Sequence, residues 1–140
     1  MVIKKTYHFY AAHRNKKAGI KCGRIHGHTY DVVVYLKPKS LPVPDKTSSG
    51  VTILFSEIDS QVEPIIKDYD HTFIIFNQDP FIFYLDEANE PYTEVPFETS
   101  AENMAIWIFN RIKNETDIPI IRIELSETKS STVIYEPISK

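Results

Sequence analysis

Cysteine and glycine are both scarce in this 140-residue chain, which has one cysteine and four glycines. A single thiol cannot form a disulfide within the chain, so Cys22 is a packing residue, a metal ligand or a reactive thiol. Long apolar runs are also missing, and the first residues do not resemble an export signal. We therefore expect neither export nor a membrane span, and we expect a cytoplasmic protein.

An excess of positive charge is absent as well. Sixteen Lys and Arg residues face nineteen Asp and Glu residues, and the resulting net charge of −3 argues against general nucleic-acid binding. The positive charges gather in one loop, at Arg14, Lys16, Lys17, Lys21 and Arg24. This loop is either an ordinary solvated loop or a collar that attracts a polyanionic small molecule.

The 42% hydrophobic content is enough for one compact domain over residues 1–140. Apolar periodicity predicts the order strand, strand, helix, helix, strand, strand. The first two strands, at about 2–13 and 25–36, form a hairpin, and the last two lie at about 121–126 and 132–135. A less regular extension at about 73–99 separates the second helix from the elements before it.

Two serines are predicted to cap the helices. Ser56 precedes one apolar stripe, which Pro64 should kink or divide, and Ser100 precedes a cleaner stripe. Within the extension, the run Phe81–Leu85 indicates an additional strand.

Three histidines indicate a metal site. His26 and His28 are two residues apart on a predicted strand, so both point to one face, and His13 ends the neighbouring strand. Three neutral imidazoles around one Zn²⁺ ion are a common arrangement that leaves a fourth position open. Gly27 leaves the opposite face free of bulk and allows a close backbone approach there.

Cys22 has two interpretations at this stage. It is either a fourth ligand that closes a structural zinc site, or a thiolate base beside an open site. A Zn²⁺ ion and a cationic loop both stabilise a thiolate, which favours the second interpretation. Asp70 and His71 favour it further, because an acid beside a histidine at a helix-to-loop turn supplies proton-transfer groups.

These motifs occur in an order that resembles the 6-pyruvoyltetrahydropterin synthase and 6-carboxytetrahydropterin synthase family, from about Lys4 to Tyr135. The motifs are Ala11-Ala12-His13-Arg14, Cys22-Gly-Arg-Ile-His26-Gly-His28, Asp70-His71, Ser100-Ala-Glu102-Asn103 and Ser126-Glu127-Thr128. The three residues between Cys22 and His26 resemble the bacterial and archaeal 6-carboxy enzymes more than the animal 6-pyruvoyl enzymes.

The resemblance implies an α+β tunnelling fold, in which a four-stranded antiparallel sheet carries two helices on one face (ββααββ). Subunits of this fold assemble into a homo-oligomeric ring, a hexamer or another size, with active sites at the interfaces. The resemblance also implies roles for individual residues: zinc ligands His13, His26 and His28, catalytic base Cys22, proton relay Asp70 and His71, pterin anchor Glu127, and assisting substrate contacts Glu102 and Ser100.

The implied reaction converts 7,8-dihydroneopterin triphosphate into 6-carboxy-5,6,7,8-tetrahydropterin, acetaldehyde and triphosphate, on the route to 7-deazapurines such as queuosine. A 6-pyruvoyl synthase, or another enzyme that cleaves the pterin side chain, shares every residue named. A zinc-stabilised binding module without catalysis is the alternative from another class. The chain departs from many relatives at Leu54, where they carry Asp, and at Thr99-Ser100, where they carry Pro-Thr. Its extension at 73–99 is also longer than in short bacterial members.

Overall fold

The predicted hairpin is present and forms the middle of the sheet in the computed structural model, which describes residues 1–45 and 47–138. The elements are β1 (Ile3–His13), β2 (His26–Leu36), α1 (Phe55–Lys67), β3 (Thr72–Phe76), α2 (Ile82–Ala88), β4 (Tyr92–Val95), α3 (Ala101–Glu115), β5 (Ile120–Thr128) and β6 (Ser131–Tyr135). The strand order across the sheet is β4-β3-β1-β2-β5-β6.

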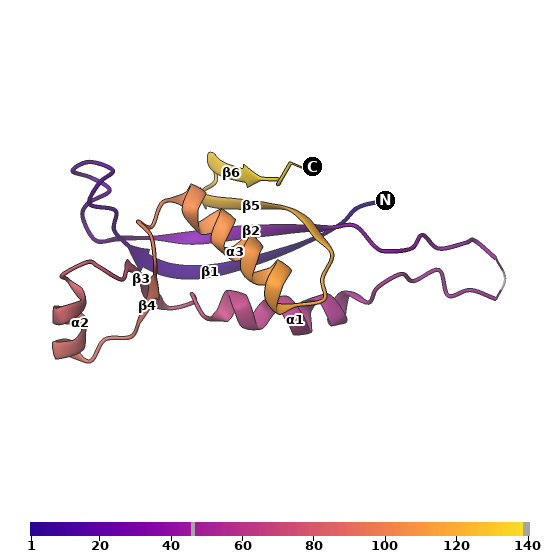
Figure 1. Ribbon diagram of the computed structural model, residues 1–140, viewed down its shortest axis with the longest axis horizontal. Coiled ribbons are helices and arrows are strands. Elements are labelled where there is room, and N and C mark those ends of the chain that lie inside the picture. Colours follow the sequence, from indigo (N-terminus) through magenta and orange to yellow (C-terminus); the bar gives the residue numbers. More distant parts are fainter. Residues whose placement is uncertain (46, 139–140) are drawn as a thin grey trace.

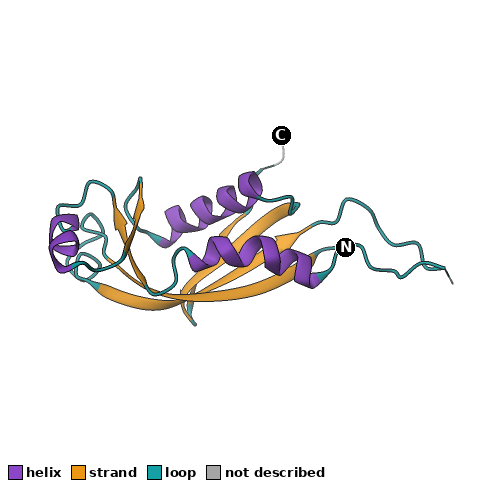
Figure 2. Ribbon diagram, turned by 90° about the horizontal axis from the view of Figure 1, so that it is seen from below, coloured by secondary structure: helices purple, strands orange, loops and turns teal. Residues whose placement is uncertain are grey.

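Alternation along β1 and β2 gives the sheet one buried face. Phe9 on β1 and Tyr30 on β2 are paired in register, are buried, and stack with ring centroids 4.7 Å apart. Helices α1 and α3 cover this same face (Figure 2). Their buried residues form the predicted stripes: Ile58, Val62, Ile65 and Ile66 on α1, and Met104, Ala105, Ile108, Phe109 and Ile112 on α3.

The predicted sheet and helix counts are too small. Beyond β1, strands β3 and β4 pair in parallel, so the sheet is mixed and six-stranded, and α2 is a third helix. The additional elements come from the extension. A four-stranded antiparallel description therefore fits only β1, β2, β5 and β6.

The strand predicted at Phe81–Leu85 is wrong, because most of this run lies in α2. Its β-propensity is overridden by packing: Leu85 is buried in a small cluster with Phe73 and Ile75 on β3. Asn89, in the left-handed conformation (φ 54°), ends the helix. The Asp79 carboxylate accepts the Phe81 amide at 2.9 Å, which satisfies one donor at the start of this turn.

Helix α1 also differs from its prediction. It is one helix that continues through Pro64, which is exposed, whereas Val62 and Ile65 on either side of it along the helix are buried. It begins at Phe55, two residues earlier than a cap at Ser56 predicts, so Ser56 lies inside the first turn and the N-cap is Leu54. Leu54 provides no side-chain cap, because its side chain has no hydrogen-bond acceptor. Ser100, in contrast, is the predicted cap of α3 and accepts the Asn103 amide at 3.3 Å.

Residues 37–45 and 47–54, between β2 and α1, form an arm that extends away from the sheet (Figure 1). The loop at 14–25 and helix α2 lie at the opposite end of the molecule. None of the helices in the described part of the chain has the length and hydrophobicity needed to cross a bilayer.

Replacing Leu54 by Asp should stabilise α1, because the new carboxylate can accept an unpaired amide of the first turn. We expect the free energy of unfolding to rise by about 1 kcal/mol, measured by urea denaturation at fixed protein concentration. Leu54→Ala is the matched control, since it removes the same exposed side chain without adding a cap. Equal stabilities for the two variants would contradict the assignment of Leu54 as the N-cap.

Candidate functional site

Histidines 13, 26 and 28 meet on the helix-covered face at one end of the β1–β2 hairpin. His13 pairs with His26 and Ala11 with His28 in the antiparallel register. One ring nitrogen from each histidine lies within 4.8 Å of the others. The small Ala11 side chain opposite His28 leaves space for its ring. The hairpin register therefore builds the predicted three-histidine cluster.

Backbone carbonyls fix the orientation of two of these rings. The Thr99 carbonyl lies 2.8 Å from His13 Nδ1, and the Arg24 carbonyl lies 2.8 Å from His26 Nδ1. A carbonyl only accepts, so each Nδ1 carries the proton and each Nε2 presents a lone pair. Such outer hydrogen bonds are typical of histidines that bind metals.

His13 Nε2 is the atom that most clearly fits a metal. It is buried and has no hydrogen-bond partner among the residues that the structure describes. Burial lowers the pKa of His13 to about 4, against the opposing effect of the Thr99 carbonyl and with a further lowering by His26 and His28. The ring is therefore neutral at physiological pH, as a ligand must be. A buried, neutral, unpaired lone pair facing two more imidazoles fits a divalent metal such as Zn²⁺.

Gly27 lies between the two β2 histidines, on the opposite face. A Cβ atom added there would lie 3.1 Å from the Ala11 carbonyl oxygen, closer than such contacts normally come. The expected close backbone approach is therefore present, and it lets β1 and β2 stay in register beside the histidines.

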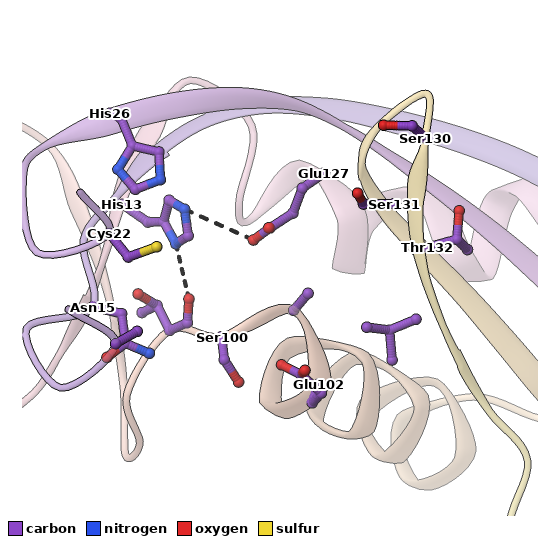
Figure 3. Close-up of a pocket in the computed structure, with 14 residues that line it drawn as sticks. His13, Asn15, Cys22, His26, Ser100, Glu102, Glu127, Ser130, Ser131 and Thr132 are labelled. Carbon is purple, nitrogen blue, oxygen red and sulfur yellow. Dashed lines mark hydrogen bonds and ion pairs between the residues drawn. The ribbon is translucent and has the colours of Figure 1, made fainter. Parts of the chain in front are cut away.

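A cavity of about 490 Å³ adjoins the histidine cluster, a volume typical of small-molecule sites. His13, His26 and Cys22 form one side of it (Figure 3). Ser100 and Glu102, at the start of α3, and Glu127, on β5, line other parts of its wall. Six of the nine predicted site residues thus line one cavity, and His28 adjoins it through the cluster.

Cys22 reaches the cavity from an exposed loop. Its sulfur points toward His13 and His26 in Figure 3. Among the described residues, the group with metal-ligand spacing contains the three histidines and not Cys22. The Asn15 amide donates to the Cys22 carbonyl at 2.7 Å, which holds this part of the loop near the end of β1.

Glu127 approaches from the other side of the cavity (Figure 3). Its Oε1 lies 3.8 Å from His13 Nε2 and 3.5 Å from the Tyr30 hydroxyl oxygen. Burial, followed by the Glu127 charge, raises the pKa of Tyr30, so the phenol stays protonated. The carboxylate thus borders both the histidine cluster and the open cavity.

Asp70 and His71 form a pair, with 2.9 Å between Asp70 Oδ2 and His71 Nδ1. The Tyr10 amide donates to Asp70 Oδ1 at 2.8 Å and is the main cause of the lowered pKa of this carboxyl. The His71 ring lies against the Tyr10 ring, and Tyr10 points to the face of β1 opposite His13. The fold therefore does not bring this pair into the cavity of its own chain.

The model of the family described as "6-pyruvoyl tetrahydropterin synthase" matches residues 2–137. The chain belongs to the 6-pyruvoyl tetrahydropterin synthase family. It is 33% identical over 139 residues to 6-carboxy-5,6,7,8-tetrahydropterin synthase of Haemophilus influenzae, covering 96% of this chain and 97% of that protein. It is 28% identical to the protein of the same name from Synechocystis, covering 96% and 92%.

Two solved structures share this fold, and one of them is a 6-pyruvoyl tetrahydropterin synthase. The Caenorhabditis elegans 6-pyruvoyl tetrahydropterin synthase superposes with a TM-score of 0.69 at 21% identity, covering 99% of this chain and 96% of that one. An uncharacterized protein from Wolinella succinogenes superposes with a TM-score of 0.79 at 20% identity, covering 97% of each chain.

Two site-shaping residues escaped the sequence argument. Thr99 is fully buried, and its carbonyl orients His13. The sequence groups Arg14 with the other cations of its loop, but its guanidinium pairs with Asp79 and is largely buried. Neither role has a sequence signal, because each depends on a contact across more than sixty residues.

Replacing His28 by Ala should abolish zinc binding, because two of the three imidazoles then remain. We expect zinc per chain, measured by atomic emission on the purified protein, to fall to the background level. His8→Ala is the matched control, since His8 lies on the same hairpin and is exposed on the other face. Full zinc occupancy in the His28 variant would exclude this cluster as the metal site.

Proposed function

We propose that this protein is a zinc-dependent 6-carboxytetrahydropterin synthase. The observation that carries the proposal is the neutral, unpaired His13 Nε2, which faces two further imidazoles beside a cavity that also holds Cys22 and Glu127. Family membership and the names of the curated relatives support a pterin substrate. The short spacing between Cys22 and His26 supports the 6-carboxy product.

The proposed reaction consumes 7,8-dihydroneopterin triphosphate and water, and it releases 6-carboxy-5,6,7,8-tetrahydropterin, acetaldehyde and triphosphate. It requires no external reductant. The side-chain carbon next to the ring is oxidised to a carboxylate, and its electrons reduce the dihydropterin to a tetrahydropterin. The product is a precursor suited to 7-deazapurine synthesis, such as the queuosine route.

His13, His26 and His28 would hold the Zn²⁺ ion, which supplies Lewis acidity that acidifies the side-chain hydroxyls and polarises the developing carbonyl. Cys22, exposed beside the cluster, removes the proton from the side-chain carbon attached to the ring. Because the sulfur lies outside the three-histidine group, we assign Cys22 as a base and not as a fourth ligand.

Glu127 anchors the pterin. A carboxylate accepts two parallel donors in one plane, which matches a ring N–H and the adjacent amino group. Glu127 lies between the histidines and the open cavity, and Cys22 lines the same cavity, which supports binding of the ring within reach of Cys22. Glu102 and Ser100 border the same space from the start of α3 and assist binding.

The cationic loop faces the triphosphate in this proposal. Lys16, Lys21 and Arg24 are exposed on it, and their charge attracts a polyanion. Arg14 does not take part, because Asp79 neutralises it.

Asp70 and His71 act in the active site of a second copy. They point to the face of the sheet opposite their own cavity, so a relay built from them requires a neighbouring subunit. His71 is well exposed and Asp70 holds its ring, which suits proton transfer across an interface. A homo-oligomeric ring with interfacial active sites is therefore part of the proposal.

Incubation of the zinc-loaded protein with 7,8-dihydroneopterin triphosphate tests the function directly. We expect mass spectrometry to detect 6-carboxytetrahydropterin and, in equal amount, trapped acetaldehyde. The protein with Cys22→Ala is the control for spontaneous breakdown. A 6-pyruvoyl product would redirect the assignment to the sister activity, and no turnover with zinc still bound would support a binding module.

Mixing two inactive variants tests the shared active site. Cys22→Ala and His71→Ala should each lower turnover by about 10²- to 10⁴-fold while retaining zinc. Co-expressed in equal amounts, they should recover roughly a quarter of the wild-type rate, because random assembly places an intact Cys22 next to an intact His71 in that share of sites. Cys22→Ala co-expressed with Glu127→Ala is the control, since both residues line one cavity of the same chain and no site regains both. Absence of recovery in the first pair would place the relay within one chain or remove it from the reaction.

A further inference from the structure

Arg14 follows His13 directly and begins the loop that carries Cys22. Its Nε donates to Asp79 Oδ2 at 2.8 Å, and its terminal nitrogen donates to Asp79 Oδ1. The side chains are only 11% and 7% exposed, respectively. The Phe81 ring lies against the guanidinium, 4.6 Å from its central carbon. Two parallel hydrogen bonds and an aromatic contact define one position for this side chain.

Asp79 is itself held firmly in the segment between β3 and α2. Its amide donates to the Phe76 carbonyl at 2.9 Å, and its Oδ1 accepts the Phe81 amide at the same distance. The carboxylate therefore connects the start of the loop to a turn that is fixed at the end of β3. This turn belongs to the long extension for which the sequence suggested no role.

The constraint on Arg14 reaches Cys22 through the backbone. Thr99 Oγ1 donates to the Arg14 carbonyl at 2.9 Å, so the main chain is held beside the residue that orients His13. The next residue, Asn15, is buried, and its amide donates to the Cys22 carbonyl at 2.7 Å. The backbone of Arg14 is thus held by Thr99, and the next residue, Asn15, is hydrogen-bonded to the backbone of Cys22.

We propose that Arg14 and Asp79 are positioning residues that hold the Cys22 loop in its working place against the histidine cluster. The extension between β3 and β4 then serves to supply Asp79 and Phe81 to this contact. The proposal rests on the function proposed above, in which Cys22 is the base. A displacement of about 1 Å at a reacting group can cost about 10²-fold in rate, so a fixed loop matters for proton transfer.

Asp79→Asn and Arg14→Lys test the proposal in the full zinc-loaded protein. The first keeps the shape but removes the charge, and the second keeps the charge but removes the two-pronged contact. We expect kcat to fall about 10- to 100-fold, with KM changed by less than about threefold and zinc content unchanged. Hydrogen–deuterium exchange should accelerate at the Asn15 amide, which donates to Cys22.

Arg111→Lys is the matched control. Arg111 also makes a two-pronged contact, with Glu115, and a further bond to Asp68, and none of these residues lines the cavity. It should lower stability without changing kcat or exchange in the loop. A similar loss of kcat in this control would show that the effect is general destabilisation, and it would overturn the positioning role.

Unchanged exchange at the Asn15 amide in both test variants would also overturn the proposal, whatever the rates. This readout needs no substrate. If the wild-type protein forms no product from 7,8-dihydroneopterin triphosphate, the proposed function fails on its own, and the exchange comparison still decides whether Arg14 and Asp79 fix the loop.

Discussion

The antiparallel register of β1 and β2 is the constraint on which the site depends. His13 faces His26 across the hairpin, and His28 follows two residues later on the same face. A shift of one residue would turn His26 and His28 to the opposite face and leave His13 alone. The stacked pair Phe9 and Tyr30 lies on the buried face of the same ladder. Burial of these rings therefore maintains the register that brings the three histidines together.

The start of helix α3 holds further parts of the site in place. Ser100 caps the helix, and the carbonyl of the residue before it, Thr99, accepts a hydrogen bond from His13. The same Thr99 uses its hydroxyl to hold the backbone of Arg14. Thr99 and Ser100 together thus fix the start of α3, the tautomer of His13 and the backbone at the start of the Cys22 loop. This sharing explains why the cavity lies where the hairpin end meets α3.

The residues of the proposed reaction lie on two opposite faces of the sheet. The histidines, Cys22 and Glu127 gather on the side covered by α1 and α3, whereas Asp70 and His71 point away from it. The left-handed backbone at His71 (φ 57°) and its hydrogen bond to the Tyr10 carbonyl hold this pair at the start of β3. A positive φ at a residue with a side chain is uncommon and is often found at functional sites, which agrees with the proposed role of His71.

Sequence alone determined the elements whose periodicity is strong and whose contacts are local. The hairpin, the α3 cap at Ser100 and the three-histidine cluster follow from alternation, capping chemistry and residue spacing. The sequence also contains the family motifs, and the match to the family model confirms the resemblance. The predicted start of α1 was wrong by two residues, because the N-cap is Leu54 and not Ser56.

Tertiary structure decided everything that depends on contacts between distant segments. The run Phe81–Leu85 favours a strand locally, yet burial of Leu85 against β3 makes most of it a helix. From the sequence, Arg14 is one of several cations in a loop. In the fold, its side chain is largely buried and forms an ion pair with Asp79. The face to which Asp70 and His71 point also depends on how β3 docks beside β1. Periodicity reports which residues share a face, whereas docking determines which faces meet.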